Sequence, residues 1–301
     1  MVQVHPRFQE NQHCYKFLPY ETKKAGVLDG CVDATYIIHL IDNGRKDNIL
    51  KQLKRVIPTK TIYIIENPGF KKCKKILKEQ KSQFDLIDAF LNAFYHAKEN
   101  NYNNILILED DFIWNDKLND EKVGNSICNF INEKNDTNFI YSLGCTPFMK
   151  INMGNEHQRV IFPSTAHSLI YGKKFREKML ESKEKDRISQ AFQLFTHWDF
   201  QIYYSETTNY FCYKSPLCYQ IFPQTENQKN WPTLGGIIYL QLGFIRLLKL
   251  DKQPSPGFEI MYFIGDVTFY ILLLIVIYFI YRLTKFVLRR KIFKNKILKT
   301  S

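Results

Sequence analysis

The chain has 301 residues and a formal net charge of +12, with 42 Lys and Arg against 30 Asp and Glu. Eight of the basic residues lie in 282–301, which hold no acid, so the remaining 281 residues carry 34 basic and 30 acidic side chains, a net of +4. A body so nearly balanced argues against a nucleic-acid partner, because nucleic-acid binders carry basic stripes on the folded domain. The length suits one α/β domain of about 250 residues with an appendage.

Strands and helices alternate in the first half of the body. Residues 1–33 form a polar lead-in without clear periodicity. Then follow a strand at 35–41, a helix at 47–56, a strand at 61–65, a helix at 84–99 and a strand at 105–108, with further strands at 139–143, 168–171 and 210–213. This order is typical of a mostly parallel sheet flanked by helices. The chain has neither a GxGxxG motif nor a Walker loop, which excludes dinucleotide-binding and P-loop proteins.

Three consecutive acids follow the apolar strand at 105–108. Glu109, Asp110 and Asp111 therefore stand where a buried strand ends, and ligands of α/β sheets bind at the carboxyl ends of strands. Carboxylates this close repel one another unless a cation compensates, and Mg²⁺ or Mn²⁺ on such acids usually shares its site with a phosphate. The alternative is that the three acids are solvated turn residues that cap the next element.

The cysteines favour a reducing compartment. Their number is odd, no CxxC pair occurs, and the N-terminus shows no apolar secretory signal, so we expect neither a zinc site nor a disulfide scaffold. One glycosylation sequon occurs, Asn135-Asp136-Thr137. The seven cysteines are Cys14, Cys31, Cys73, Cys128, Cys145, Cys212 and Cys218.

A long apolar segment lies near the C-terminus. Residues 267–281 are 15 uncharged residues, which flanking residues extend to about 20, enough to span a bilayer. We expect a transmembrane helix at 262–282 and a basic tail at 283–301; the alternative is a buried core helix. The positive-inside rule places the tail in the cytoplasm and residues 1–260 outside. The cysteines and the absence of a signal favour a cytosolic domain, so the side stays open.

Five sequence pieces between about residues 35 and 231 together resemble glycosyltransferase family 25, the lipopolysaccharide-biosynthesis and collagen galactosyltransferase type. They are Ile37-Ile38-His39-Leu40 with Arg45 and Lys46, Ile107 to Asp111, Ser168 to Leu180, His197-Trp198-Asp199, and Pro216 to Gln220. The resemblance implies a GT-A-like domain over 34–235, joined to the transmembrane helix by a connecting segment at 236–261.

The resemblance also implies metal-dependent transfer of a hexose, galactose or glucose, from a nucleotide-diphosphate sugar to a hydroxyl of a glycan or protein acceptor. Asp111 would be the direct ligand of Mn²⁺ or Mg²⁺, and Glu109 would contact the ion through water or the ribose. Asp110 would orient the loop and, with Arg45 and His39, contact the donor.

The acceptor side of such a site would involve three further residues. Asp199 is the expected general base, with an acid at a helix start as the alternative. Trp198 and Trp231 would stack on sugar, with core packing as the alternative. His167 and His197 are expected to be structural histidines.

Two other functions fit the same sequence. One is a catalytically inactive homologue that serves as a membrane-bound scaffold or interaction protein. The other is a protein that binds anionic membranes or nucleic acid through its basic tail, residues 282–301. Metal-dependent binding of a nucleotide diphosphate to residues 1–260 separates the transferase from both.

Overall fold

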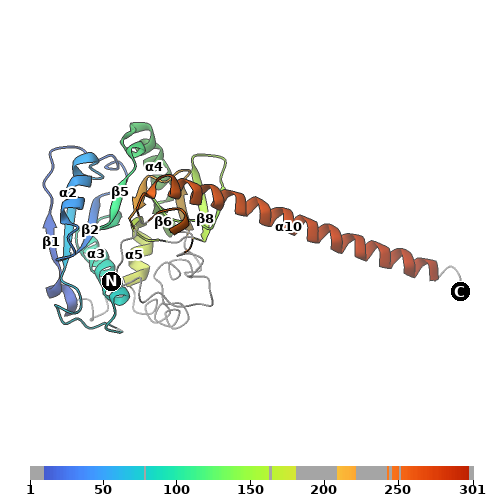
Figure 1. Cartoon of the computed structure of the whole chain (residues 1–301), viewed down its shortest axis with the longest axis horizontal. Coiled ribbons are helices and arrows are strands. Elements are labelled where there is room, and N and C mark those ends of the chain that lie inside the picture. The colour runs from blue at the N-terminus through green and yellow to red at the C-terminus, as the bar shows by residue number, and fades with distance from the viewer. Residues whose placement is uncertain are drawn as a thin grey trace.

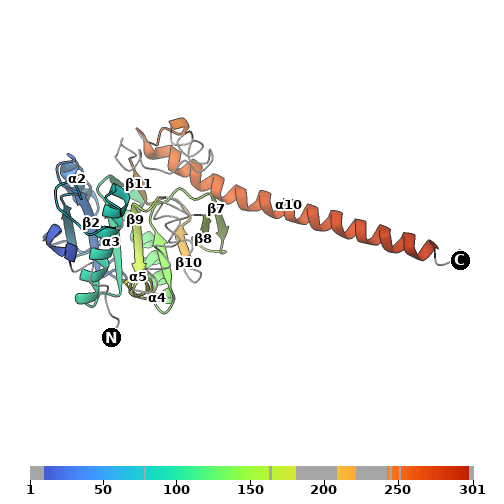
Figure 2. The same ribbon diagram turned by 90° about the horizontal axis from the view of Figure 1, so that it is seen from below.

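The structure is a computed structural model that describes residues 10–77, 79–162, 165–180, 209–221, 243, 246–250 and 252–297, the last of these without side chains beyond residue 288. The described residues form an α/β domain from which one long helix projects (Figures 1 and 2).

The first half of the domain contains β1 (Lys16–Pro19), β2 (Ala34–Leu40), α2 (Lys46–Arg55), β3 (Ile62–Asn67), α3 (Ser82–Glu99), β4 (Asn104–Glu109), β5 (Phe112–Trp114) and α4 (Glu121–Lys134), with 3-10 turns at Gln12–Cys14 and Asp116–Asn119. The second half contains β6 (Phe139–Ser142), β7 (Met149–Asn152), β8 (His157–Phe162), β9 (Ser168–Gly172), α5 (Lys173–Leu180), β10 (Asn209–Tyr213), β11 (Cys218–Gln220) and α10 (Pro254–Ile297).

The large sheet has nine strands in the order β1-β3-β2-β4-β9-β6-β10-β8-β7, and β11 pairs with β5 in a separate ladder. The expected α/β class with flanking helices is confirmed. The sheet is mixed, however, and not mostly parallel. β3, β2 and β4 run parallel, as do β6 and β10, whereas β9 lies antiparallel between β4 and β6 and the β7–β8 pair is antiparallel. The strand–helix alternation that produces parallel pairing stops at β4.

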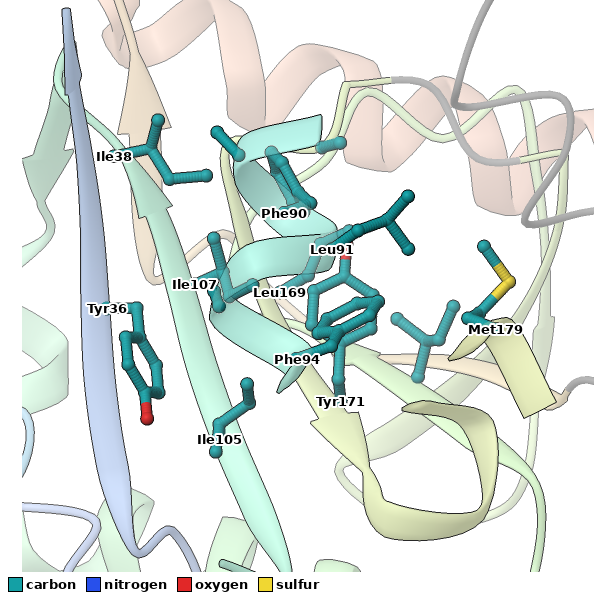
Figure 3. Close-up of a cluster of buried hydrophobic side chains, with 14 of the residues drawn as sticks. Tyr36, Ile38, Phe90, Leu91, Phe94, Ile105, Ile107, Leu169, Tyr171 and Met179 are labelled. Carbon is teal, nitrogen blue, oxygen red and sulfur yellow. The ribbon is translucent and has the colours of Figure 1, made fainter. Parts of the chain in front are cut away.

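Two apolar layers hold the helices against the two faces of the sheet. β4 shows this most simply, because Ile105 and Ile107 belong to one layer and Leu106 and Leu108 to the other. Figure 3 shows the first layer, in which side chains of α3 pack over Ile107. Full burial of such a side chain stabilises the fold by about 1.5–3 kcal/mol. The same burial keeps β4 continuous up to its acidic end.

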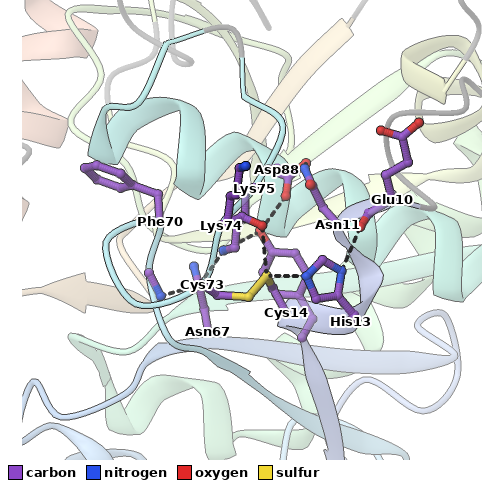
Figure 4. The surroundings of a disulfide bond; sticks show 12 residues. Glu10, Asn11, His13, Cys14, Asn67, Phe70, Cys73, Lys74, Lys75 and Asp88 are labelled. Atoms are coloured by element: carbon purple, nitrogen blue, oxygen red, sulfur yellow. Dashed lines mark hydrogen bonds between the residues drawn. A yellow bond between two sulfur atoms is a disulfide. The ribbon is translucent and has the colours of Figure 1, made fainter.

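Residues 10–33 belong to the domain, although the sequence predicts only a lead-in there. β1 pairs antiparallel with β3, with Lys16 opposite Glu66. Cys14 forms a disulfide with Cys73, just before β1 and after β3 respectively (Figure 4).

A second disulfide links Cys31 to Cys128 on α4. The expectation of no disulfides is therefore wrong. It failed because each bridge joins cysteines far apart in sequence, by 59 and 97 residues, and such pairings cannot be read from spacing.

Helix α10 begins on the domain and continues beyond it. Phe258, Met261 and Tyr262 are buried against the domain, and Asp266 accepts a hydrogen bond from Gln158 Nε2 at 3.0 Å. Every residue from 270 to 288 is exposed. The core-helix alternative is thus wrong.

The segment 254–288 is long and apolar enough to cross a membrane, and an 18-residue window within it has a mean hydropathy of 2.4. The exposed apolar stretch starts later than the expected boundary at residue 262, because the first turns of that range are docked on the domain.

Candidate functional site

The three acids lie at the carboxyl end of β4, as the sequence predicts. β4 ends at Glu109, and Asp110 and Asp111 link it to β5. β2 runs parallel to β4 with Ile38 opposite Glu109, so the end of β2 and the turn after it adjoin the acids. His39 follows Ile38 directly. The structure therefore brings the residues expected to contact the donor to one edge of the sheet.

Asp110 is clamped by four protein donors. Its Oδ2 accepts hydrogen bonds from Leu40 N at 3.0 Å, Asn43 Nδ2 at 2.6 Å and His39 Nδ1 at 3.2 Å, and its Oδ1 accepts one from Arg45 Nη1 at 2.7 Å. Burial alone would raise the pKa of Asp110, but these hydrogen bonds and the charge of Arg45 outweigh it and lower the pKa. Asp110 is thus an ionised residue that ties the acidic turn to the β2–α2 turn.

Asp111 is buried and only loosely paired. Gln220 Nε2 lies 3.2 Å from both carboxylate oxygens, and Arg45 Nη1 lies 3.6 Å from Oδ2. Burial raises the pKa of Asp111 to about 7, with the charge of Arg45 opposing the shift and that of Asp110 adding to it. One cation shared with a better-paired neighbour leaves Asp111 short of positive charge.

The β2–α2 turn and the first turns of α2 supply contacts that the sequence analysis missed. Gly44 has φ of 75°, a left-handed conformation that glycine adopts without strain, and it lies between the two residues that reach Asp110 from this turn. Asn48 Nδ2 donates to the carbonyls of Asp110 at 3.3 Å and Phe112 at 3.2 Å. Trp114 N donates to Gln52 Oε1 at 3.0 Å. These contacts fix the backbone from the acids through β5.

A signal for these helix contacts exists in the sequence. Asn48 and Gln52 are four residues apart, next to the apolar Ile49 and Leu53 that α2 buries. Polar amides at helical spacing beside a buried stripe indicate a buried partner, because a buried amide needs one.

Gln220 is a further site residue that the sequence pattern does not reveal. It pairs with Phe112 in the β11–β5 ladder, and Ile221 N donates to Asp111 O at 3.1 Å. In the sequence, Gln220 stands out only as the last residue of the piece Pro216 to Gln220. Its separation of 109 residues from Asp111 hides the contact.

Glu109 is half-buried, and its backbone N donates to His167 O at 2.9 Å. Glu109, Asp110 and Asp111 do not gather their carboxylates around one point; among the described residues, the cluster of three possible ligand atoms within 4.8 Å is that of His13, Cys14 and Cys73. Two of that cluster's members form a disulfide. Although the three acids are consecutive in the sequence, their carboxylates are not placed to bind one ion together.

His167 is fully buried, and burial lowers its pKa to about 4, so it is neutral. Its Nε2 lies 3.4 Å from the carbonyl oxygen of Cys218, and its ring packs edge-on against Phe258 of α10. These contacts agree with the expected structural role.

Asp111 fits a hard divalent cation best. Among the described side chains, Asp110 has close donors on both oxygens, whereas Asp111 has the Gln220 amide at 3.2 Å and one cation at 3.6 Å. Mg²⁺ is commonly held by one or two carboxylates together with substrate phosphates, so a full cage of protein ligands is unnecessary. Asp199, Trp198, His197 and Trp231 lie outside the described residues, and with them the expected acceptor side.

No family model and no curated protein match the chain. Among solved structures, it is similar to a glycosyltransferase involved in the glycosylation of the major capsid of PBCV-1, at 10% identity and a TM-score of 0.39 over 66% of this chain and 97% of that one. It is also similar to a putative glucose-1-phosphate thymidylyltransferase from Bacillus anthracis, at 12% identity and a TM-score of 0.31 over 64% and 73%. Both TM-scores are below 0.5, so neither similarity assigns a function to this chain.

Proposed function

We propose that this chain is a membrane-anchored glycosyltransferase that moves a hexose from a nucleotide-diphosphate sugar to a hydroxyl of a glycan or protein acceptor. The observation that carries this proposal is that two adjacent acids, Asp110 and Asp111, differ in their hydrogen bonding and in the direction of their pKa shifts. Asp110 is locked into the fold by four donors, while Asp111 is buried, short of positive charge and left with a raised pKa. A structural turn needs the first acid and gains nothing from the second.

Asp111 would hold Mn²⁺ or Mg²⁺, with Glu109 reaching the ion through water. When bound, the ion supplies positive charge for the diphosphate leaving group. Arg45 is partly exposed, with 23% of its side chain accessible, and lies between Asp110 and Asp111. Its guanidinium has further N–H groups besides the one that donates to Asp110. These N–H groups would bind a phosphate of the nucleotide-diphosphate sugar.

The turn that carries Asp111 is held rigidly. Asn48 ties the carbonyls on both sides of Asp111, and Gln220 holds its carboxylate from β11. A carboxylate fixed in this way would hold the cation without first having to be ordered. The expected general base, Asp199, would take the proton of the acceptor hydroxyl.

The anchor in this proposal is α10. Its most apolar stretch projects from the domain and is almost wholly exposed, which is costly in water and favourable in a bilayer. Lys and Arg beyond residue 281 would reach the headgroups.

A catalytically inactive, membrane-bound scaffold is the second candidate. One observation favours it: the three acids do not converge on a common point. A scaffold would need the fold and α10 but no occupied donor site.

The test is a melt of the full chain in detergent micelles at pH 7.5, with and without Mn²⁺ and a set of uridine-diphosphate sugars. A ligand at 100 times its Kd stabilises the folded state by about 2.7 kcal/mol, which is readily seen as a rise in Tm. Asp111→Asn should abolish the shift, whereas the matched control Asp116→Asn, at an acid 78% exposed in the 3-10 turn after β5, should keep it. A wild-type Tm that no donor moves would leave the scaffold as the better reading.

A further inference from the structure

Two disulfides cross-link the domain between distant parts of the chain. Cys14–Cys73 has a Cα–Cα distance of 5.9 Å, and Cys31–Cys128 one of 4.8 Å, both within the range that a disulfide requires. The other three cysteines, Cys145, Cys212 and Cys218, are buried and free. The odd total thus reflects two bridges and three core thiols.

Disulfides that join separate elements persist in oxidising compartments and are rare in the cytosol. Both bridges here link elements that meet only in the folded domain: one ties the segment before β1 to the loop after β3, and the other ties the loop before β2 to α4. This arrangement favours a domain that folds outside the cytosol.

The charges on the two sides of α10's apolar stretch point independently to the same side. Residues 282–301 carry eight Lys and Arg and no acid, whereas residues 252–266 carry one Lys, one Glu and one Asp. Cytoplasmic flanks of membrane spans are rich in Lys and Arg, so the tail belongs in the cytoplasm and the domain on the opposite side.

An exposed acceptor for modification lies on that domain. Asn135 follows the C-terminus of α4, is exposed, and opens the one Asn-x-Ser/Thr sequence in the chain. Its Oδ1 accepts a hydrogen bond from Nδ2 of Asn104, the first residue of β4, at 2.8 Å. Asp111 lies past the other end of β4, so a glycan on Asn135 would leave that site uncovered.

We propose that the domain lies on the oxidising, non-cytosolic side of a membrane, with both disulfides formed, and that Asn135 there accepts an N-linked glycan. The proposal rests on the membrane span of α10 proposed above and is independent of the transferase chemistry. The group attached to Asn135 would be a preassembled oligosaccharide delivered by the N-glycosylation machinery of the cell.

The state of the cysteines is tested by counting thiols in the full chain. The chain is expressed in a eukaryotic cell, denatured, and treated with a polyethylene-glycol maleimide that adds a fixed mass to each thiol. Wild type should gain three additions, and seven after reduction. Cys31→Ser, which frees Cys128, should gain four. A wild type with seven additions before reduction, and a Cys31→Ser variant with six, would overturn the proposal.

The side of the membrane is tested on the same cells by endoglycosidase treatment. Wild type should shift to higher mobility, and Asn135→Gln should already run at that position. As the matched control, Ile297→Thr creates an acceptor sequence at Asn295 in the tail. Combined with Asn135→Gln, it should stay unmodified. A glycan on Asn295, or a wild type that endoglycosidase does not shift, contradicts the proposal.

Carbonate extraction separates the possible failures. If carbonate extracts the chain from the membrane, α10 is not a membrane span, and the proposal is overturned. The Mn²⁺-dependent melt would still report on the transferase site, because that experiment uses detergent and does not depend on α10.

Discussion

Gln220 holds both carboxylate oxygens of Asp111 through a single amide nitrogen, at 3.2 Å each. An amide donates a hydrogen bond, which favours the ionised carboxylate, but it carries no net charge and so does not supply a counter-charge. Asp111 is thus held in place without a close counter-charge of its own, which distinguishes it from Asp110. That difference underlies the responses of the two residues to pH and to substitution that are predicted first.

The first prediction concerns the pH dependence of metal binding. A cation requires the ionised form of Asp111, whose pKa is raised to about 7 by burial. Protons therefore compete below that pH, and we expect the affinity for Mn²⁺ to fall by up to about tenfold per pH unit as pH drops below 7. Calorimetric titration of the full chain between pH 5.5 and 8.5 measures this. A constant affinity across that range would show that Asp111 is not a ligand.

The second prediction concerns the stability of Asp111→Asn without metal. The folded pKa of Asp111 is raised from 3.8, so between that value and about 7 the folded state binds more protons than the unfolded state. Wild type therefore loses stability as pH rises through this window, by up to about 1.4 kcal/mol per pH unit. Asn cannot ionise, so the variant should melt higher than wild type at pH 7.5 and show little difference near pH 4. A variant less stable than wild type at pH 7.5 would indicate a structural carboxylate.

The third prediction is the opposite response at the neighbouring residue. The pKa of Asp110 is lowered, because its hydrogen bonds and Arg45 outweigh burial, so its ionised form stabilises the fold at neutral pH. That stability is lost as pH falls through its folded pKa. Asp110→Asn should lower stability at pH 7.5 by about 3 kcal/mol, since it takes from a partly buried guanidinium its closest carboxylate. Paired melts of the two Asn variants at pH 7.5 should therefore shift in opposite directions.

The fourth prediction concerns the junction between α10 and the domain. Lys150 is fully buried; its Nζ lies 3.2 Å from Asp266 Oδ2 and 4.3 Å from the ring centre of Tyr262. Asp266→Asn removes the charge opposite a buried ammonium and should cost about 1–3 kcal/mol. Adding Lys150→Met should restore most of that loss, because an apolar side chain of similar length needs no counter-charge. A double variant no more stable than the single one would contradict this account.

The sequence predicts well what depends on local pattern. The strands from 35 to 108 and the helices between them were found because buried runs and helical spacing are continuous there. The sequence pattern does not predict β1 or β11. β1 is a largely exposed strand at the sheet edge and so has no buried run, and β11 has only three residues. The antiparallel entry of β9 could not be read from Ser168–Gly172, since a buried strand carries no mark of its direction.

The same limit applies to the site. Three neighbouring acids at a strand end predict a charged edge, and the structure places them there. Which of them is satisfied depends on Arg45 and Gln220, which lie 65 and 109 residues away from their respective partners. Only the folded arrangement assigns the locked role to Asp110 and leaves Asp111 with a raised pKa.

Helix α10 would also set the distance between Asp111 and a membrane that the helix spans. Tyr219, next to Gln220, donates a hydrogen bond to Glu259, and the helix runs without interruption from Glu259 to residue 270, where the continuously exposed stretch begins. At 1.5 Å per residue, that distance is about 16 Å. A membrane-anchored chain with no flexible tether at this junction would keep Asp111 at a fixed height above the lipid headgroups. This fixed distance would favour acceptors that lie close to the bilayer surface.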